Sequence, residues 1–364
     1  MPEPTLQITE ALGKVIDPEL KRPVTELDMV RDVLVENGHL TVTIALTVAG
    51  CPLRSSFETQ VSEHLLPLPG VDSVSLQFDV MSPDERAALT DKLRGSVSGR
   101  SKGVSVDAST RVLAIASGKG GVGKSTLSVN LAAAFDRLGQ RVGVLDADVY
   151  GHSIPHMLGV TQRPVVVDKM IVPPVRGDLK LMSIGFFLEE NAPVMWRGPM
   201  LHRALEQFLS DVHWGELDTL VVDMPPGTGD VSISLGQLLP RAEVVVVTTP
   251  QPAAQQVAVR AAQMAQKTGM RLIGALENMS YLVGTGQEIF GAGGGEELAA
   301  AIDAPLLGKV PLDPRLREQA DIGDPLVWAE PENETARTIF EIAEAITAAG
   351  RAPGTVKKAL PLAT

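Results

Sequence analysis

The chain has 364 residues, of which 44% are hydrophobic, 21% charged and 4% aromatic. Its 44 acidic and 32 basic side chains give a net charge of −12, which argues against non-specific nucleic-acid binding, because such binding needs clustered lysine and arginine. No apolar run reaches the roughly 18 residues of a membrane span, residues 1–15 lack a signal-peptide pattern, and the single cysteine excludes an intrachain disulfide framework. We therefore expect a cytoplasmic protein that does not bind membranes and is long enough for two domains.

The first quarter of the sequence predicts a small α+β domain over residues 1–92. Its strongest signal is Asn37-Gly38 between two apolar runs, which is typical of a β-hairpin. The expected elements are a helix at 5–16, two strands within 32–46, a helix within 52–70 and a strand at 71–80. Residues 93–109 are rich in Gly, Ser and small polar side chains and predict a flexible linker.

Residues 110–350 predict a doubly wound α/β domain. Apolar β-branched runs alternate there with helical stretches, and the runs lie at 111–116, 141–148, 219–226, 242–250 and 271–280. Because the apolarity is continuous, each strand should be covered on both faces, as in a mainly parallel sheet. The remaining residues, 351–364, contain two prolines and a glycine and predict a loose tail.

Residues 117–126, SGKGGVGKST, fit the phosphate-loop pattern G-x-x-x-x-G-K-[ST] between an expected strand and an expected helix. In such a loop backbone N–H groups surround the phosphates, Lys124 brings charge to the outer phosphates, and the Ser125 hydroxyl binds Mg²⁺. The predicted nucleotide-binding residues are Gly118, Gly120, Gly121, Val122, Gly123, Lys124, Ser125 and Thr126. The motif predicts a nucleoside triphosphate site with Mg²⁺.

Three aspartates follow expected strands at the sheet edge where ligands of such folds bind. Asp223 fits the residue that holds Mg²⁺ through water, and Asp148 is the candidate that orients the attacking water near the metal, with Asp146 as its alternative. Helix caps or turn bonds are the competing interpretation of these residues. The sequence shows no strong general base, so we expect slow ATP hydrolysis that relies on positioning.

The loop carries a second lysine, Lys119. Within one chain it would crowd a second cation beside Lys124. Across a two-fold axis it would instead neutralise transition-state charge on the neighbour's nucleotide. The sequence therefore predicts an ATP-bound homodimer, with Lys119 as a catalytic residue and hydrolysis that depends on the dimer.

GKGGVGKST resembles the deviant phosphate loop of the MinD, ParA, arsenite-pump and nitrogenase iron-protein ATPases. Over about 110–350, VLDADVYGHSIPHMLG, VMWRGPM, LVVDMPPGTGD, TTPQ and ENMSY resemble the Mrp/ApbC branch of iron–sulfur cluster carrier ATPases. DPEL, ELDMV and AGCP resemble the MIP18-like domain that often precedes that branch.

The resemblance implies an ATPase that assists iron–sulfur cluster assembly or transfer. It implies ATP and Mg²⁺ as cofactors, apo iron–sulfur proteins and cluster scaffold proteins as partners, and a second lysine that acts across a nucleotide-sandwich dimer. It also implies that Asn278 contacts the adenine amino edge and that Pro311 lies near the base. An asparagine buried in a turn is the alternative interpretation of Asn278.

The sequence departs from that family at the cluster site. The family usually carries Cys-x-x-Cys soon after NMSY, one pair per subunit, to bridge a [4Fe–4S] cluster at the dimer interface. Residues 278–299 contain no cysteine or histidine, so the usual site cannot form here. Cys51 is the remaining candidate cluster ligand, and a small packed apolar side chain is its alternative role.

Three other features have competing interpretations. Pro155 between His152 and His156 argues against a helical metal pair. Arg197, beside a tryptophan, is either a clamp for a phosphate or partner or a packed surface stack. Residues 291–300, GAGGGEELAA, predict a glycine-rich helix start, because no expected strand precedes them as in a dinucleotide loop.

Two other functions stay open at this point. One is a positioning ATPase of the MinD/ParA kind, which would bind DNA or membrane as an ATP dimer; the charge, the tail and the N-terminal domain argue against it. The other is an ATP-dependent adaptor that recruits cluster-assembly factors and carries no metal itself.

Overall fold

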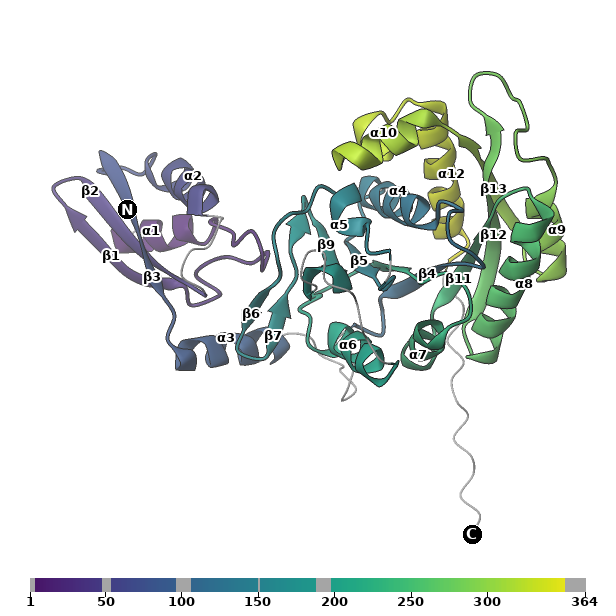
Figure 1. The fold of residues 1–364 in the computed structure, drawn as a ribbon. Helices are drawn as coiled ribbons and strands as arrows, with labels where there is room; N and C mark the ends of the chain where they lie inside the picture. Colours follow the sequence, from purple (N-terminus) through teal and green to yellow (C-terminus); the bar gives the residue numbers. More distant parts are fainter. Residues whose placement is uncertain (1–3, 48–53, 96–105, 150, 188–197, 351–364) are drawn as a thin grey trace, which may run out of the picture. The chain divides into compact units, whose positions relative to one another are not determined.

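The computed structural model describes residues 4–47, 54–95, 106–149, 151–187 and 198–350 (Figure 1). The chain divides into two compact units, each described by itself below. The smaller unit comprises Met1–Ser105, Arg163–Pro174 and Asp211–His213, and the larger comprises Val106–Gln162, Val175–Ser210 and Trp214–Thr364. After residue 105, the chain therefore leaves the larger unit and returns to it twice.

A three-stranded sheet and the helices α1 to α3 form most of the smaller unit. Strand β1 pairs antiparallel with β2, which pairs parallel with β3. The φ angles of 48° at Asn37 and 82° at Gly38 close the β1–β2 turn, which confirms the predicted hairpin. The elements are α1 (Pro4–Leu12), β1 (Val30–Glu36), β2 (His39–Leu46), α2 (Arg54–Leu65), β3 (Ser73–Val80) and α3 (Pro83–Gly95).

Two helix boundaries differ from the sequence-based expectation. Helix α1 ends at Leu12, earlier than residue 16, and the next residue is Gly13, which disfavours helix continuation. Helix α3 was not predicted, and its end occupies 93–95, where a linker was expected. Its start is a capping box, in which the Ser82 hydroxyl accepts from the Glu85 N–H at 3.2 Å and the Glu85 carboxylate accepts from the Ser82 N–H at 2.6 Å.

A hairpin from the middle of the chain completes the core of the smaller unit. Strands β6 (Val165–Val167) and β7 (Met170–Val172) pair antiparallel. Three of their side chains are 1–2% exposed and join the cluster around β2 and α2; they are Val167, Met170 and Val172. The Thr90 hydroxyl of α3 donates to the Val167 carbonyl at 3.4 Å. The sequence had placed this stretch in the ATPase domain, so its packing here was not foreseen.

An eight-stranded sheet forms the centre of the larger unit, in the order β13-β12-β11-β4-β10-β5-β9-β8. All its strands run parallel except β8, which pairs antiparallel with β9 at the edge. The strands are β4 (Arg111–Ser117), β5 (Val142–Asp146), β8 (Val175–Arg176), β9 (Leu179–Ser183), β10 (Thr219–Asp223), β11 (Glu243–Thr248), β12 (Arg271–Leu282) and β13 (Leu306–Leu312).

Helices cover both faces of this sheet, as Figure 1 shows. Helices α4 and α12 pack on one face, and α8 and α9 pack on the other. The helices are α4 (Lys124–Arg137), α5 (Ile154–Met157), α6 (Gly198–Ser210), α7 (Asp230–Leu238), α8 (Pro252–Lys267), α9 (Gly294–Ala301), α10 (Pro314–Ile322), α11 (Leu326–Ala329) and α12 (Glu334–Ala348). Every residue of β5, β10 and β11 is buried, as their continuous apolarity predicted, and the doubly wound fold is confirmed.

The register brings the functional strand ends together. Asp223 at the end of β10 pairs with Asp146 at the end of β5 and, on its other side, with Ile115 near the end of β4. Parallel strands end at one edge, so the segments that follow β4, β5 and β10 meet there.

Candidate nucleotide-binding site

The loop between β4 and α4 has an open, glycine-lined side. Gly121 and Gly123 take φ of 80° and 81°, a conformation that favours glycine. A Cβ on Gly118 would lie 2.2 Å from the backbone of Val257 in α8. Apart from the adjoining residues of the chain, no described residue comes within 4 Å of the Cβ positions of Gly120 and Gly121. The loop therefore packs closely against α8 at Gly118 and is open at Gly120 and Gly121 toward the described part of the chain.

The carboxylate of Asp223 accepts hydrogen bonds from three polar side chains at the start of α4. Its Oδ2 accepts from Lys124 Nζ and from Ser125 Oγ, both at 2.7 Å, and its Oδ1 accepts from Ser128 Oγ at 2.6 Å. Lys124 and Asp223 are both buried. Lys124 Nζ also lies 3.5 Å from Oδ2 of Asp148. The structure thus brings together four of the predicted site residues, because β5 and β10 end beside the start of α4.

Asp146 is more deeply buried than Asp148, with exposed fractions of 0% and 7%. It is fully buried, and it accepts from Ser183 Oγ at 2.9 Å and from the Asp148 N–H at 3.2 Å. Burial, and next to it the charge of Asp223, raises the pKa of Asp146 to about 8. Asp148 forms an ion pair with Lys124 and accepts from the Gly151 N–H at 3.1 Å. Of the two aspartates at the end of β5, it is therefore the one that contacts the phosphate loop.

Asn278 and Pro311 lie on neighbouring strands next to the loop. Asn278 is 4% exposed in β12, and its Nδ2 donates to the Val122 carbonyl at 2.9 Å. Its Oδ1 is buried without a hydrogen-bond partner among the described residues. Pro311 is buried in β13 directly after Val310, the register partner of Asn278. Met279, which follows Asn278 in β12, has a φ of 58°. The regular pairing of β12 with β13 is interrupted after Asn278.

Lys119 stands apart from these contacts. Its side chain is half-buried, and the carbonyl of the same residue accepts from Ser117 Oγ at 3.1 Å. Within the described ranges, the Lys119 ammonium forms neither a hydrogen bond nor an ion pair. The structure therefore leaves this amine without an anionic partner from its own described chain.

The structure describes only some of the other residues that the sequence singled out. Cys51 and Arg197 lie outside the described residues. His152 and His156 are exposed, and α5 spans only Ile154–Met157. Among the residues that the structure describes, no three His, Cys, Asp or Glu side chains gather as a metal-ion site. Residues 291–300 form the predicted helix start, where Glu277 Oε2 accepts from the Gly295 N–H of α9 at 2.5 Å.

Sequence reasoning missed two hydroxyls that hold the aspartates, Ser128 and Ser183. The spacing of Ser128, four residues after Lys124, places it on the same helix face as the lysine and could have revealed it. Ser183 gave no such signal, because its position beside Asp146 depends on β9 being the neighbour of β5 in the sheet.

The residues present fit a magnesium nucleotide. The open side of Gly120 and Gly121 leaves room for phosphates, at a helix N-terminus that favours negative charge. Ser125 and Asp223 offer the oxygen ligands that Mg²⁺ prefers, and Mg²⁺ normally takes few protein ligands and completes its shell with water and phosphate. The unpaired Oδ1 of Asn278 is an acceptor still available to a ligand.

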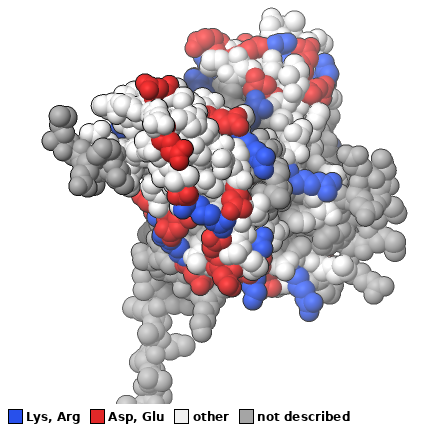
Figure 2. Space-filling view, turned by 90° about the vertical axis from the view of Figure 1, so that its left-hand side faces the viewer, with Lys and Arg blue, Asp and Glu red and all other residues white. Residues whose placement is uncertain are grey.

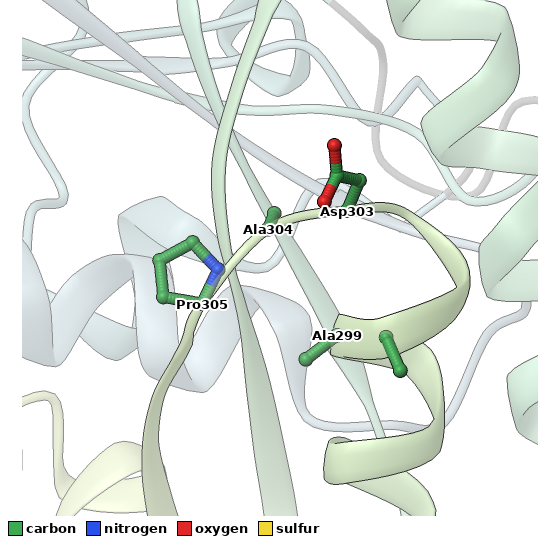
Figure 3. Close-up of a pocket in the computed structure, with 5 residues that line it drawn as sticks. Ala299, Asp303, Ala304 and Pro305 are labelled. Carbon is green, nitrogen blue, oxygen red and sulfur yellow. The ribbon is translucent and has the colours of Figure 1, made fainter.

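The larger unit also has a hollow away from the phosphate loop. This hollow of about 360 Å³ lies between the end of α9 and the start of β13 (Figure 3). It is therefore near the amino ends of the parallel strands, whereas the phosphate loop follows the carboxyl end of β4. Asp303 is the one charged residue in its lining, which otherwise consists of Ala299, Ala300, Ala304 and Pro305. On the face in Figure 2, acidic and basic side chains are interspersed. Among the described helices, none combines the length and apolarity needed to cross a bilayer.

Comparison with known proteins assigns the chain to a family. The profile of the NUBPL iron-transfer P-loop NTPases matches residues 108–347, and that of an iron–sulfur cluster assembly protein matches residues 6–76. The iron–sulfur cluster carrier protein of Mycobacterium tuberculosis is 50% identical over 353 residues, which cover 93% of this chain and 92% of the relative. That of Bacillus subtilis is 42% identical over 312 residues, 84% of this chain and 87% of the relative.

Solved structures agree with the fold. A nucleotide-binding protein from Archaeoglobus fulgidus in complex with ADP superposes with a TM-score of 0.53 at 35% identity, over 62% of this chain and 89% of that one. The septum site-determining protein MinD of Pyrococcus horikoshii, complexed with Mg-ADP, gives a TM-score of 0.52 at 23% identity, over 66% and 98%, and supports the fold alone. These matches confirm the resemblance that the motifs indicated. The chain belongs to the family of NUBPL iron-transfer P-loop NTPases.

Proposed function

We propose that the protein acts as a homodimer that couples ATP hydrolysis to iron–sulfur cluster assembly or to cluster transfer to apo-proteins. The observation that carries this proposal is the convergence of Lys124 and Ser125 on Asp223 beneath an open glycine loop. The same chain matches a cluster-assembly profile over residues 6–76, and its relatives are named iron–sulfur cluster carriers. ATP and Mg²⁺ are the cofactors that we propose for this P-loop NTPase.

The contacts of the loop support the nucleotide roles that we propose. When ATP binds, the Lys124 ammonium leaves Asp223 for the outer phosphates, while N–H groups from Gly118 to Thr126 surround the phosphate chain. Ser125 and Asp223 would hold Mg²⁺, the aspartate through water. The bound metal neutralises charge that develops on the transferred phosphoryl group.

Asp148 orients the attacking water in this proposal. Its carboxylate adjoins Lys124, whereas Asp146 is fully buried behind it. An aspartate that orients water contributes positioning more than base strength, so turnover is slow. Lys119 acts on the nucleotide of the partner subunit, an assignment supported by the absence of an anion for it in the described part of its own chain.

The amide oxygen of Asn278, which has no partner among the described residues, supports the proposed base site. Oδ1 of Asn278 accepts a hydrogen bond from the adenine amino group, since Nδ2 already donates to Val122. Pro311, next to the register partner of Asn278, packs near the base.

The cargo assignment rests on the family and on one thiol. Cys51 is the single cysteine of the chain and the candidate cluster ligand, together with the same residue of a second copy or with cysteines of a partner. Apo iron–sulfur proteins and cluster scaffold proteins are the proposed partners. We extend the proposal to a cytoplasmic location, because thiolate ligands stay reduced in that compartment.

A second candidate function is an ATP-dependent adaptor that carries no metal. The observation that favours it is the absence of cysteine and histidine from residues 278–299, where the resembling family holds its cluster. In that case the smaller unit recruits assembly factors, and the nucleotide state controls their release.

Anaerobic reconstitution with iron and sulfide separates the two functions. Wild-type protein and Cys51→Ser are compared by iron and sulfide content and by absorbance. Cluster in the wild type and none in the variant supports the carrier. No cluster in either, also in the presence of scaffold proteins, contradicts the carrier and leaves the adaptor.

A further inference from the structure

Ser128 makes a contact that its place in the helix does not require. It lies fully buried in α4, one turn after Lys124, and its Oγ is 2.6 Å from Asp223 Oδ1 and 3.0 Å from the Lys124 carbonyl. A hydroxyl has one hydrogen to donate, and a carboxylate is the stronger acceptor, so the proton points to Asp223. The common bond of a helical serine to the carbonyl four residues earlier is therefore the secondary contact here.

The two oxygens of Asp223 have different neighbours. Oδ2 receives Lys124 Nζ and Ser125 Oγ, and Oδ1 receives Ser128 Oγ. Asp223 is 0% exposed, so an oxygen that lost its donor would be buried without compensation. A carboxylate held at one oxygen cannot rotate without breaking that bond. The orientation of Oδ2 toward the phosphate loop thus depends on Ser128.

We propose that Ser128 is a positioning residue for the magnesium nucleotide: its hydroxyl fixes Oδ1 of Asp223 and thereby presents Oδ2 to Ser125 and Lys124. This inference rests on the proposed role of Asp223 toward Mg²⁺. Ser128 itself touches neither the metal nor the phosphates. Its loss should therefore weaken the contribution of magnesium to nucleotide binding and leave the metal-independent part unchanged.

The test is a titration of a fluorescent ADP with full-length protein, followed by anisotropy, over a series of Mg²⁺ concentrations and in EDTA. For Ser128→Ala we expect the Mg²⁺ concentration at half-maximal tightening to rise at least about tenfold, because a bond to a charged group is lost. In EDTA the affinity should change less than about twofold, since the phosphate loop is untouched. Ser128→Thr keeps the hydroxyl and should restore the wild-type magnesium midpoint.

Two further variants control for folding. Ser128→Cys keeps the size of the side chain but has only a weak donor, so it should show the same shift if Ser128→Ala does not fold. Ser232 is also fully buried, in α7, and its hydroxyl has no partner among the described residues. Ser232→Ala therefore removes a buried hydroxyl that does not contact Asp223, and its magnesium midpoint should equal the wild type.

Three outcomes would overturn the inference. They are an unchanged magnesium midpoint in Ser128→Ala and Ser128→Cys, an equal loss of affinity with Mg²⁺ and in EDTA, and a failure of Ser128→Thr to restore the midpoint. Wild-type protein that binds ADP equally with and without Mg²⁺ would instead contradict the proposed role of Asp223, so the two failures are distinguishable.

Discussion

Lys119 is the residue that links the phosphate loop to a second subunit in the proposed mechanism. We expect Lys119→Ala to bind ATP within about twofold of wild type but to hydrolyse it at least about 100-fold more slowly, because a cation supplied across an interface stabilises transition-state charge. Nucleotide titration and steady-state phosphate release measure the two effects. Lys267→Ala, at an exposed lysine at the end of α8, is the matched control. Wild-type turnover in Lys119→Ala would refute the role.

Glu19 gives the smaller unit a pH dependence. Burial, and next to it the charge of Asp17, raises the pKa of Glu19 from 4.5 to about 7. Burial also raises the pKa of Asp17, whose carboxylate accepts from the Glu19 and Leu20 N–H groups, both at 2.8 Å. A raised acid pKa means that the folded state binds the proton more tightly. The stabilisation is therefore complete below pH 4.5 and is lost as the pH rises through about 7.

Replacement of Glu19 by glutamine should remove this dependence. Glu19→Gln should be more stable than wild type by about 1 kcal/mol at pH 8, after allowance for solvent screening, and about equally stable at pH 5. Urea unfolding at both pH values, followed through the backbone amide signals of β2, measures the difference in the free energy of unfolding. Glu63→Gln, at an exposed glutamate of α2, is the control and should change the free energy of unfolding only slightly, and equally, at the two pH values. The expectation fails if Glu19→Gln shifts the two values equally.

Single residues were predictable from sequence where the chemistry is local. Lys124 and Ser125 follow from the loop motif, and Asp148 and Asp223 from the position of carboxylates after apolar runs. The partner of Asp146 was not predictable. Ser183 reaches Asp146 only because β9 lies beside β5, and strand order is not encoded in the periodicity of either segment.

At the scale of elements, hydrophobic pattern and turn chemistry predicted several strands and turns correctly. Features that depend on tertiary packing could not be predicted in this way. The hairpin at Asn37-Gly38 and the buried parallel strands follow from local pattern. Helix α3 was missed because the small polar residues that follow it outweighed the Ser82–Glu85 capping box. The role of the β6–β7 hairpin was missed because which core it completes depends on contacts far apart in sequence.

The β6–β7 hairpin should be needed for the stability of the smaller unit. Met170 is 2% exposed in that core, whereas Val166, on the facing strand, is 55% exposed. Met170→Ala should lower the free energy of unfolding of the smaller unit by about 2–5 kcal/mol. Hydrogen exchange of β2 amides in the full chain should then accelerate at least about 30-fold. Val166→Ala should leave exchange within about threefold of wild type, and equal exchange in all three proteins would contradict the packing.

At the scale of the whole molecule, one chain joins a unit that matches a cluster-assembly profile to a P-loop NTPase. The chain returns to the smaller unit at Arg163–Pro174, soon after Asp148 of the candidate nucleotide site. The segment that follows Asp148, the proposed water-orienting aspartate, is thus continuous with part of the core of the smaller unit. A short segment of the chain therefore connects the candidate nucleotide site to the unit that carries the candidate cluster ligand.

The most direct test of the account is the ATP-dependent activation of an apo iron–sulfur protein. The apo-protein is incubated anaerobically with iron, sulfide, a scaffold protein and Mg-ATP, together with wild-type protein or Lys124→Ala, and its recovered cluster is measured by absorbance. We predict that wild type raises the yield only when ATP is present and that Lys124→Ala does not raise it, because that variant lacks the lysine proposed to hold the phosphates. Equal yields with wild type and Lys124→Ala, or with and without ATP, would contradict the coupling of this site to cluster transfer.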